Sequence, residues 1–119
     1  MTSNLATAPE RIDFLKRRFA DAEIVSFRSL NGDLELEYVD WQERPVKLKF
    51  EEAVGYEAFS PEGVSLSHAT TGVNDPLIVV ACTAAGEDNP SAFQIFSFVS
   101  AWTGVPVLRI VAKEVWAAV

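Results

Sequence analysis

AEIVSFRSLNGDLELEY, residues 22–38, is the stretch that decides the fold. Two runs in which apolar and polar residues alternate flank Asn31-Gly32, and this pattern is the strongest short-range signal for a β-hairpin with a type I′ turn. Pairing Leu30 with Asp33 sets the register of the hairpin. The register predicts a face that packs on the core and is built from these opposite pairs: Val25 with Tyr38, Phe27 with Leu36, and Ser29 with Leu34.

The other face of this hairpin is charged. Its predicted opposite pairs are Arg28 with Glu35 and Ser26 with Glu37. The next strand, VKLKF at residues 46–50, can add its apolar side chains to the core face if the loop through residues 40–45 has odd length or contains a bulge. Lys47 and Lys49 then face the two glutamates. We interpret the row as a solvated lattice of opposite charges, because each exposed pair contributes only about 0.2–1 kcal/mol.

Continuing the same alternation past Phe50 places Val54, Tyr56 and Ala58 on the inner side, together with Glu52. A carboxylate there is either a functional group in an apolar setting or the sign of a bend. We favour a bend at residues 51–53, because Gly55 follows closely and glycine within a strand often marks an irregularity.

A helix is predicted at about residues 8–20. Thr7 and Glu10 have capping-box spacing, and Pro9 suits a first helical turn. The cluster Lys16 to Arg18 falls near the helix end, where bases complement the helix dipole, so it needs no anion site.

The second half of the chain reads as further strands. SPEG at residues 60–63 is a turn, and the strand after it has His68 on its apolar side. LIVVACT at residues 77–83 is interpreted as a buried strand, although Asp75-Pro76 before it could cap a helix. Two closing strands are expected about TGVP, residues 103–106.

The predicted fold class is α+β, with an N-terminal helix packed on a curved antiparallel sheet of about six or seven strands. The 119 residues fit a single domain, 1–119, with residues 1–7 expected to form a flexible tail. The longest apolar run, PLIVVACTAA, is too short to span a membrane. The start MTSNLATAPE lacks the pattern of a secretory signal, and Cys82 is the single cysteine. We therefore expect a soluble, cytoplasmic protein.

No catalytic motif stands out. His68 and several serines could supply a triad only if some spacing tied them together, and no nucleophile-elbow sequence is present. Cys82 and His68 lack the paired spacing of zinc motifs, and the six glycines are scattered without a phosphate loop. We expect no enzyme activity, no cofactor and no metal.

Charge placement gives the strongest functional signal. The net charge is −7, and no Lys or Arg occurs between Lys49 and Arg109. Such a field repels nucleic acid and favours a basic protein partner. Residues predicted to contact this partner are Trp41, Glu51, Glu57, Glu62, Glu87 and Asp88. The alternative for Trp41 is a ring that folds back on the sheet.

This acidic, motif-free profile is similar to that of many antitoxin or immunity proteins, which neutralise basic nuclease toxins. The leading hypothesis is therefore a non-enzymatic acidic protein-binding domain with a basic partner, such as a toxin. The alternative is a small-ligand binder or an enzyme with a pocket between helix and sheet, using Glu52 or His68.

Overall fold

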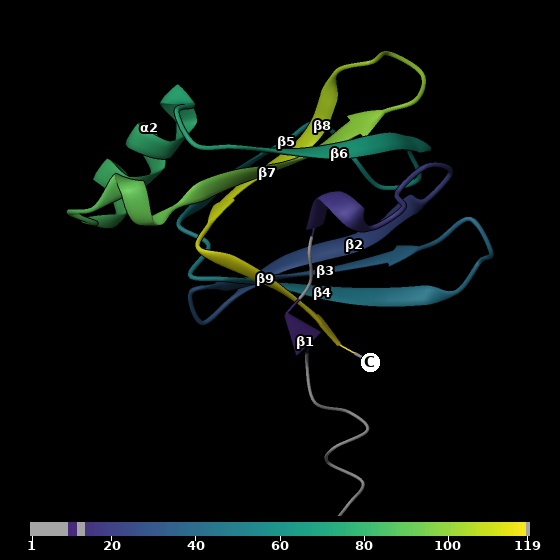
Figure 1. Cartoon of the computed structure of the whole chain (residues 1–119), viewed down its shortest axis with the longest axis horizontal. Helices are drawn as coiled ribbons and strands as arrows, with labels where there is room; N and C mark the ends of the chain where they lie inside the picture. The colour runs from purple at the N-terminus through teal and green to yellow at the C-terminus, as the bar shows by residue number, and fades with distance from the viewer. Residues whose placement is uncertain (1–9, 12–13, 119) are drawn as a thin grey trace, which may run out of the picture.

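The computed structural model describes residues 10–11 and 14–118. Within them, two antiparallel sheets lie one above the other, the lower called sheet A and the upper called sheet B (Figure 1). Sheet A has, in spatial order, β1 (Glu10–Arg11), β9 (Glu114–Ala118), β4 (Pro45–Glu51), β3 (Asp33–Val39) and β2 (Glu23–Leu30). Sheet B has β5 (Gly55–Ala58), β8 (Pro106–Ala112), β7 (Gln94–Ser100) and β6 (Leu66–Gly72). The other elements are the α-helix α2 (Pro76–Ala85) and two 3₁₀ turns, η1 (Phe14–Lys16) and η2 (Pro90–Ala92).

The α+β class is confirmed, but the predicted arrangement is wrong in two respects. The strands form two sheets instead of one, and the α-helix lies in the middle of the chain instead of at its N-terminus. The core fills the space between the sheets, and aromatic rings from both layers meet there. Its largest cluster contains Phe14, Phe19, Phe50, Phe96 and Phe98.

The Asn31-Gly32 hairpin is confirmed, with Leu30 opposite Asp33 and the predicted register held from there to Ser26. The prediction that Val25 faces Tyr38 is wrong. A β-bulge at Val25 places Ile24 opposite Tyr38, so Ile24 is buried while Val25 is exposed. An extra residue in one strand shifts the alternation by one position, which is why the pattern fails only beyond the bulge.

The third strand follows the predicted parity. The connection between β3 and β4 has odd length, residues 40–44, and Leu48 and Phe50 are buried on the core face. Lys47 pairs in register with Glu37, and Lys49 with Glu35. Loop length and hydrophobic pattern thus agree on the register, as they must where one face of a sheet is buried.

The predicted bend after Phe50 is where the chain passes from sheet A to sheet B. Glu52 has a positive φ of 50° and forms an ion pair with Lys113 at 2.8 Å. The connection between β8 and β9, which also passes from one sheet to the other, lies beside this segment. The Lys113 N–H in that connection donates to the carbonyl of Glu51 at 3.0 Å. Glu52 is therefore not a buried functional carboxylate.

The predicted N-terminal helix is wrong for the described part of residues 8–20. Glu10–Arg11 pairs with β9, and Phe14–Lys16 forms a single 3₁₀ turn. Phe14 and Phe19 are both buried with ring centroids 5.2 Å apart, whereas residues five apart on an α-helix point about 140° away from each other. Burying both rings in one cluster therefore excludes a continuous helix. Of the predicted capping residues, Glu10 lies in β1, whereas Thr7, Pro9 and the tail lie outside the described residues.

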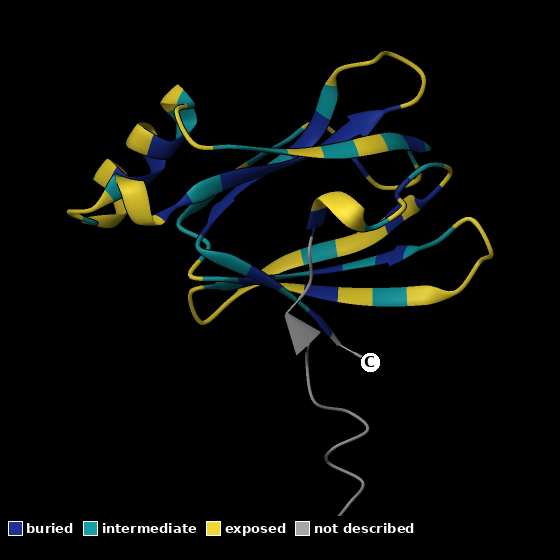
Figure 2. Cartoon of the chain, in the orientation of Figure 1, coloured by how far each residue is buried: buried dark blue, intermediate teal, exposed yellow. Residues whose placement is uncertain are grey.

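The predicted strand at residues 77–83 is a helix, α2. Asp75 caps it by accepting the Leu77 N–H at 2.9 Å, Pro76 occupies the first turn, and Gly86 ends it in the left-handed conformation. Figure 2 shows its buried side against sheet B and its exposed side outward. Among the described residues no helix is long and apolar enough to cross a membrane.

Two further side chains differ from their predicted orientation. A β-bulge between Leu66 and His68 turns His68 away from the core, and its side chain is exposed. Tyr56, predicted to face inward, is 48% exposed and packs edge-on against the ring of Phe27. Neither residue is therefore part of the buried core.

Candidate functional site

An open hollow lies on the outer face of sheet B. Figure 1 shows that α2 lies beside one end of this sheet. We call the hollow the sheet B groove; its volume is about 800 Å³. It forms because the apolar side chains of α2 cover only one end of the sheet, chiefly Ile95 and Val111. The lining residues are Glu57, Phe59, Thr70, Thr71, Gly72, Asp75, Ile95, Ser97, Thr103, Val105, Pro106, Val107 and Arg109.

The floor of the groove is one polar row across sheet B. Strand register places Arg109 opposite Glu57 on one side and opposite Ser97 on the other. Thr70 of β6 lies opposite Ser97 and extends the row. Outward positions of a sheet are ordinarily solvated, yet Ser97 is only 5% exposed.

Arg109 is held by two carboxylates. One guanidinium nitrogen lies 3.3 Å from Glu57 Oε1, and the other bonds Asp75 Oδ2. The second oxygen of Asp75 accepts the Leu77 N–H, so both oxygens of this carboxylate are engaged. Glu57 Oε2 has no polar partner among the described residues. The three charged groups sum to −1, and the uncompensated charge is at Glu57.

Apolar side chains stand at the rim of the groove. Phe59 is 62% exposed and Val105 is 55% exposed. Val105 belongs to the β7–β8 loop, whose Trp102 is 70% exposed. A second hollow of about 480 Å³ shares Asp75 with the groove and includes the exposed Val73. Exposed apolar side chains gathered on one surface are one mark of a protein interaction site.

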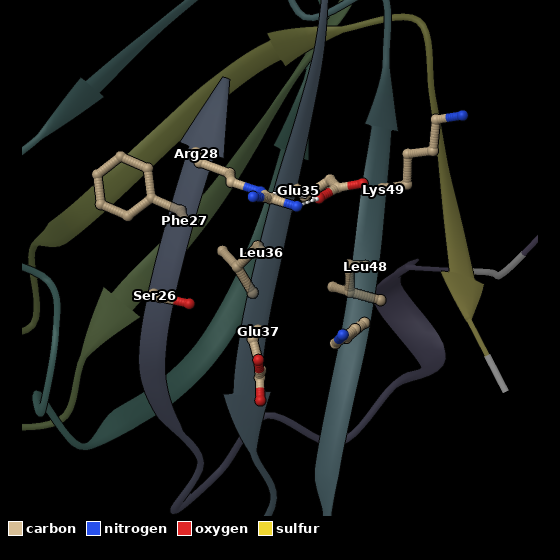
Figure 3. Close-up of a pocket in the computed structure, with 9 residues that line it drawn as sticks. Ser26, Phe27, Arg28, Glu35, Leu36, Glu37, Leu48 and Lys49 are labelled. Carbon is tan, nitrogen blue, oxygen red and sulfur yellow. Dashed lines mark hydrogen bonds and ion pairs between the residues drawn. The ribbon is translucent and has the colours of Figure 1, made fainter. Parts of the chain in front are cut away.

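The charged face of sheet A forms a different hollow, of about 580 Å³ (Figure 3). Arg28 donates to Glu35 Oε1 at 3.0 and 2.9 Å, as the sequence predicts. Lys49 reaches Asp33 at 3.4 Å and not the glutamate opposite it. This surface offers no exposed apolar anchor, since the side chains of Leu36 and Leu48 point into the core. It fits the predicted solvated face.

Three of the predicted partner-binding acids lie near the passage between the sheets. Glu51 accepts the Trp116 indole N–H at 2.9 Å. The hydrogen bond to Glu52, aided by the charges of Glu87 and Glu51, raises the pKa of the Lys113 ammonium above its ordinary value. Asp88 follows Glu87 in the loop after α2. We call the group Glu51, Glu52, Glu87 and Asp88 the acidic corner.

The remaining predicted residues are spread over other parts of the surface. Glu57 is in the sheet B groove, and Glu62, in the β5–β6 loop, bridges to Ile24 of β2. Trp41 lies in the β3–β4 loop. Figure 1 shows this loop at the end of the molecule opposite α2. The Trp41 ring is 47% exposed and carries the Arg18 guanidinium 4.6 Å from its centroid. The six residues do not form one continuous patch.

The groups considered for catalysis are not assembled with one another. His68 Nδ1 lies 2.9 Å from Ser67 Oγ, its sequence neighbour, and neither His68 nor Glu52 lines the sheet B groove. No group of three or more His, Cys, Asp or Glu suited to hold a metal occurs in the described part of the chain. Burial, with the nearby Glu87 charge, raises the pKa of the Cys82 thiol, which keeps it protonated and unreactive.

Sequence reasoning found Glu57 but missed the residues that make its surroundings a site. Phe59 and Glu57 are two apart at the end of a strand, and this spacing alone would have placed them on one face. Arg109 and Asp75 are 34 positions apart, and only the tertiary fold brings them together.

Comparison with protein-family models, with curated proteins and with solved structures finds no match. The assignment of a function therefore rests on the geometry and electrostatics of these surfaces.

Proposed function

We propose that this chain is a non-enzymatic domain that binds a basic protein partner. The observation that carries the proposal is the sheet B groove, where exposed Phe59 and Val105 flank the incompletely paired carboxylate of Glu57. Exposed aromatic side chains are frequent energetic anchors of protein interfaces.

The charge distribution supports a basic partner. Four predicted acids, Glu57, Glu62, Glu87 and Asp88, lie in sheet B or in the loops between its elements, and Glu51 ends β4 at the passage to sheet B. The excess of negative charge between Lys49 and Arg109 would steer a cationic protein toward this half of the molecule. An antitoxin or immunity protein acting on a basic nuclease toxin fits this profile, because nucleases carry cationic surfaces for phosphate. A cytoplasmic location is part of the proposal, supported by a lone cysteine without a disulfide partner.

The proposal is tested by the kinetics of binding to the partner, recovered by pull-down from the source cell. Replacing the five acids together by Gln or Asn should slow association by about tenfold or more at low salt. A matched control neutralises Asp21, Glu23, Glu35, Glu37 and Glu43, which removes the same number of negative charges from residues outside sheet B.

The control is expected to associate faster than the test variant. A wild-type association rate in the test variant, or a partner that is itself acidic, contradicts the proposal. His68→Ala and Glu52→Gln should leave binding intact. Loss of binding in these two would instead favour a small-ligand pocket or an active site.

A further inference from the structure

We propose that the sheet B groove receives an arginine side chain of the partner, with its guanidinium held between the carboxylate of Glu57 and the ring of Phe59. This inference rests on the proposed function and assigns the position and chemistry of the central contact. It concerns two residues that both line the groove.

The first step is the relative position of these side chains. Glu57 is on β5, and the Phe59 N–H continues the pairing with β8 by donating to the Val107 carbonyl at 2.9 Å. Residues two apart on such a strand project to the same side, about 6.6 Å from one another. Both side chains line the groove, and Phe59 is 62% exposed. A planar cation fits between a carboxylate and a ring at this separation.

The second step is the sign of the ligand. Arg109 already bonds both Glu57 and Asp75, so the cluster of three charged groups has a net charge of −1 and disfavours an incoming anion. Asp75 also has no oxygen to spare, since it caps α2 as well. Glu57 uses only Oε1, in a contact of 3.3 Å, and its side chain is 39% exposed. The free acceptor of the groove therefore selects a cation.

The third step is the choice of arginine over lysine. A guanidinium can donate in its plane to the carboxylate while its face stacks on an aromatic ring. Lysine offers a compact and more strongly hydrated charge that cannot make both contacts in this way. Apolar residues beside the arginine would cover Val105, which is 55% exposed. The predicted ligand is thus an arginine within an apolar segment of a protein.

The test is an amide-resolved NMR titration of the full chain with the peptide acetyl-Val-Arg-Val-amide. We expect saturable shifts at the amides of Glu57, Phe59 and Arg109. The same peptide with neutral citrulline in place of arginine should bind at least about threefold more weakly, and so should the lysine peptide. Shifts centred on the acidic corner, or equal binding of the arginine and citrulline peptides, would overturn the inference.

Variants keep the result specific. Glu57→Gln and Phe59→Ala should each weaken the arginine peptide by about threefold or more. Glu37→Gln is the matched control, because it removes a strand carboxylate from the outer face of sheet A and should change nothing. The spectrum of each free variant shows whether it is folded. Equal affinities in all three folded variants would refute the site.

The two proposals can fail separately. If the five-acid variant slows partner association while Glu57→Gln and Phe59→Ala bind the peptide and the partner like the wild type, the acidic binding domain stands and the arginine site is wrong. If the natural partner is acidic but the arginine peptide still binds at Glu57 and Phe59, the proposed function is wrong. The assignment of the groove as an arginine-binding site then still holds.

Discussion

Replacing Gly55 by alanine should destabilise the protein by pushing α2 away from sheet B. A Cβ at this position would lie 2.8 Å from Ala81 Cβ, where real Cβ contacts are essentially never found below 3.0 Å. Gly55 is paired with Val111 on β8, and the helix packs directly on it. Overpacking of this kind costs about 1–3 kcal/mol, because the backbone must move to relieve the contact.

The sign of the effect makes the prediction sharp. Without a clash, Gly→Ala should stabilise by about 0.4–1 kcal/mol through the lower entropy of the unfolded chain. Urea unfolding followed by the fluorescence of the three tryptophans would give the difference in free energy of unfolding. A stabilised Gly55→Ala variant would refute the close packing of α2 on β5.

Two further variants complete this experiment. In Gly55→Ala/Ala81→Gly the obstructing Cβ is gone, and the next atom, Ala81 Cα, is at an ordinary 3.7 Å. The double-mutant cycle should therefore show a favourable coupling of about 1–3 kcal/mol. Gly72→Ala is the control, because its Cβ would meet only the Cγ2 methyl group of Ile95, at a less severe 3.2 Å. We expect that change to be within about 1 kcal/mol of the wild type.

Three other predictions concern sheet A. A double-mutant cycle on Arg28 and Glu35, whose side chains are 70% and 43% exposed, should give a coupling below about 1 kcal/mol that fades with added salt; a large, salt-resistant value would mean that this face is buried in an oligomer. Leu48→Ala, at a position 1% exposed, should cost about 2–5 kcal/mol in urea unfolding, and a loss under about 1 kcal/mol would contradict the strand parity. Hydrogen bonds, first of all from the Arg44 N–H, lower the pKa of the Asp40 carboxyl in the folded protein below its ordinary value of 3.8. The ionised Asp40 should therefore stabilise the fold fully above pH 3.8, and this stabilisation should be lost as the pH falls through the lowered pKa. An Asp40 NMR signal that titrates at or above 3.8 would contradict this.

Local sequence signals correctly predicted the turn at Asn31-Gly32 and the strand pairs next to it. Asn31-Gly32 fixes a turn type, and the turn fixes the register of two strands, so the pairs near it were correct. The bulge at Val25 left no mark in the alternating pattern, because both Ile24 and Val25 are apolar. At Glu52, the same sequence signal fits either a bend within one strand or a passage of the chain to a second sheet. Only the packing of the core distinguishes these two structures.

The helix and the groove show where local reasoning fails. An uncharged apolar run such as residues 77–83 has no period that separates a buried strand from a helix, and only the cap at Asp75-Pro76 indicated the correct choice. The groove depends on where that helix packs, since α2 supplies one wall through Asp75 and leaves the rest of sheet B open. Glu57 was predicted from charge alone, whereas its contact with Arg109 depends on the pairing of β5 with β8.

The measurement that tests the central claim most directly is the association rate with the natural partner over a series of salt concentrations. For an acidic domain that captures a basic protein through sheet B, the rate of the wild-type chain should fall steeply as ionic strength rises, while dissociation changes little. The Glu57→Gln/Phe59→Ala variant should dissociate faster, because the central contact is lost. An association rate that is independent of salt, with unchanged dissociation in this variant, would contradict both the acidic steering and the groove as its docking site.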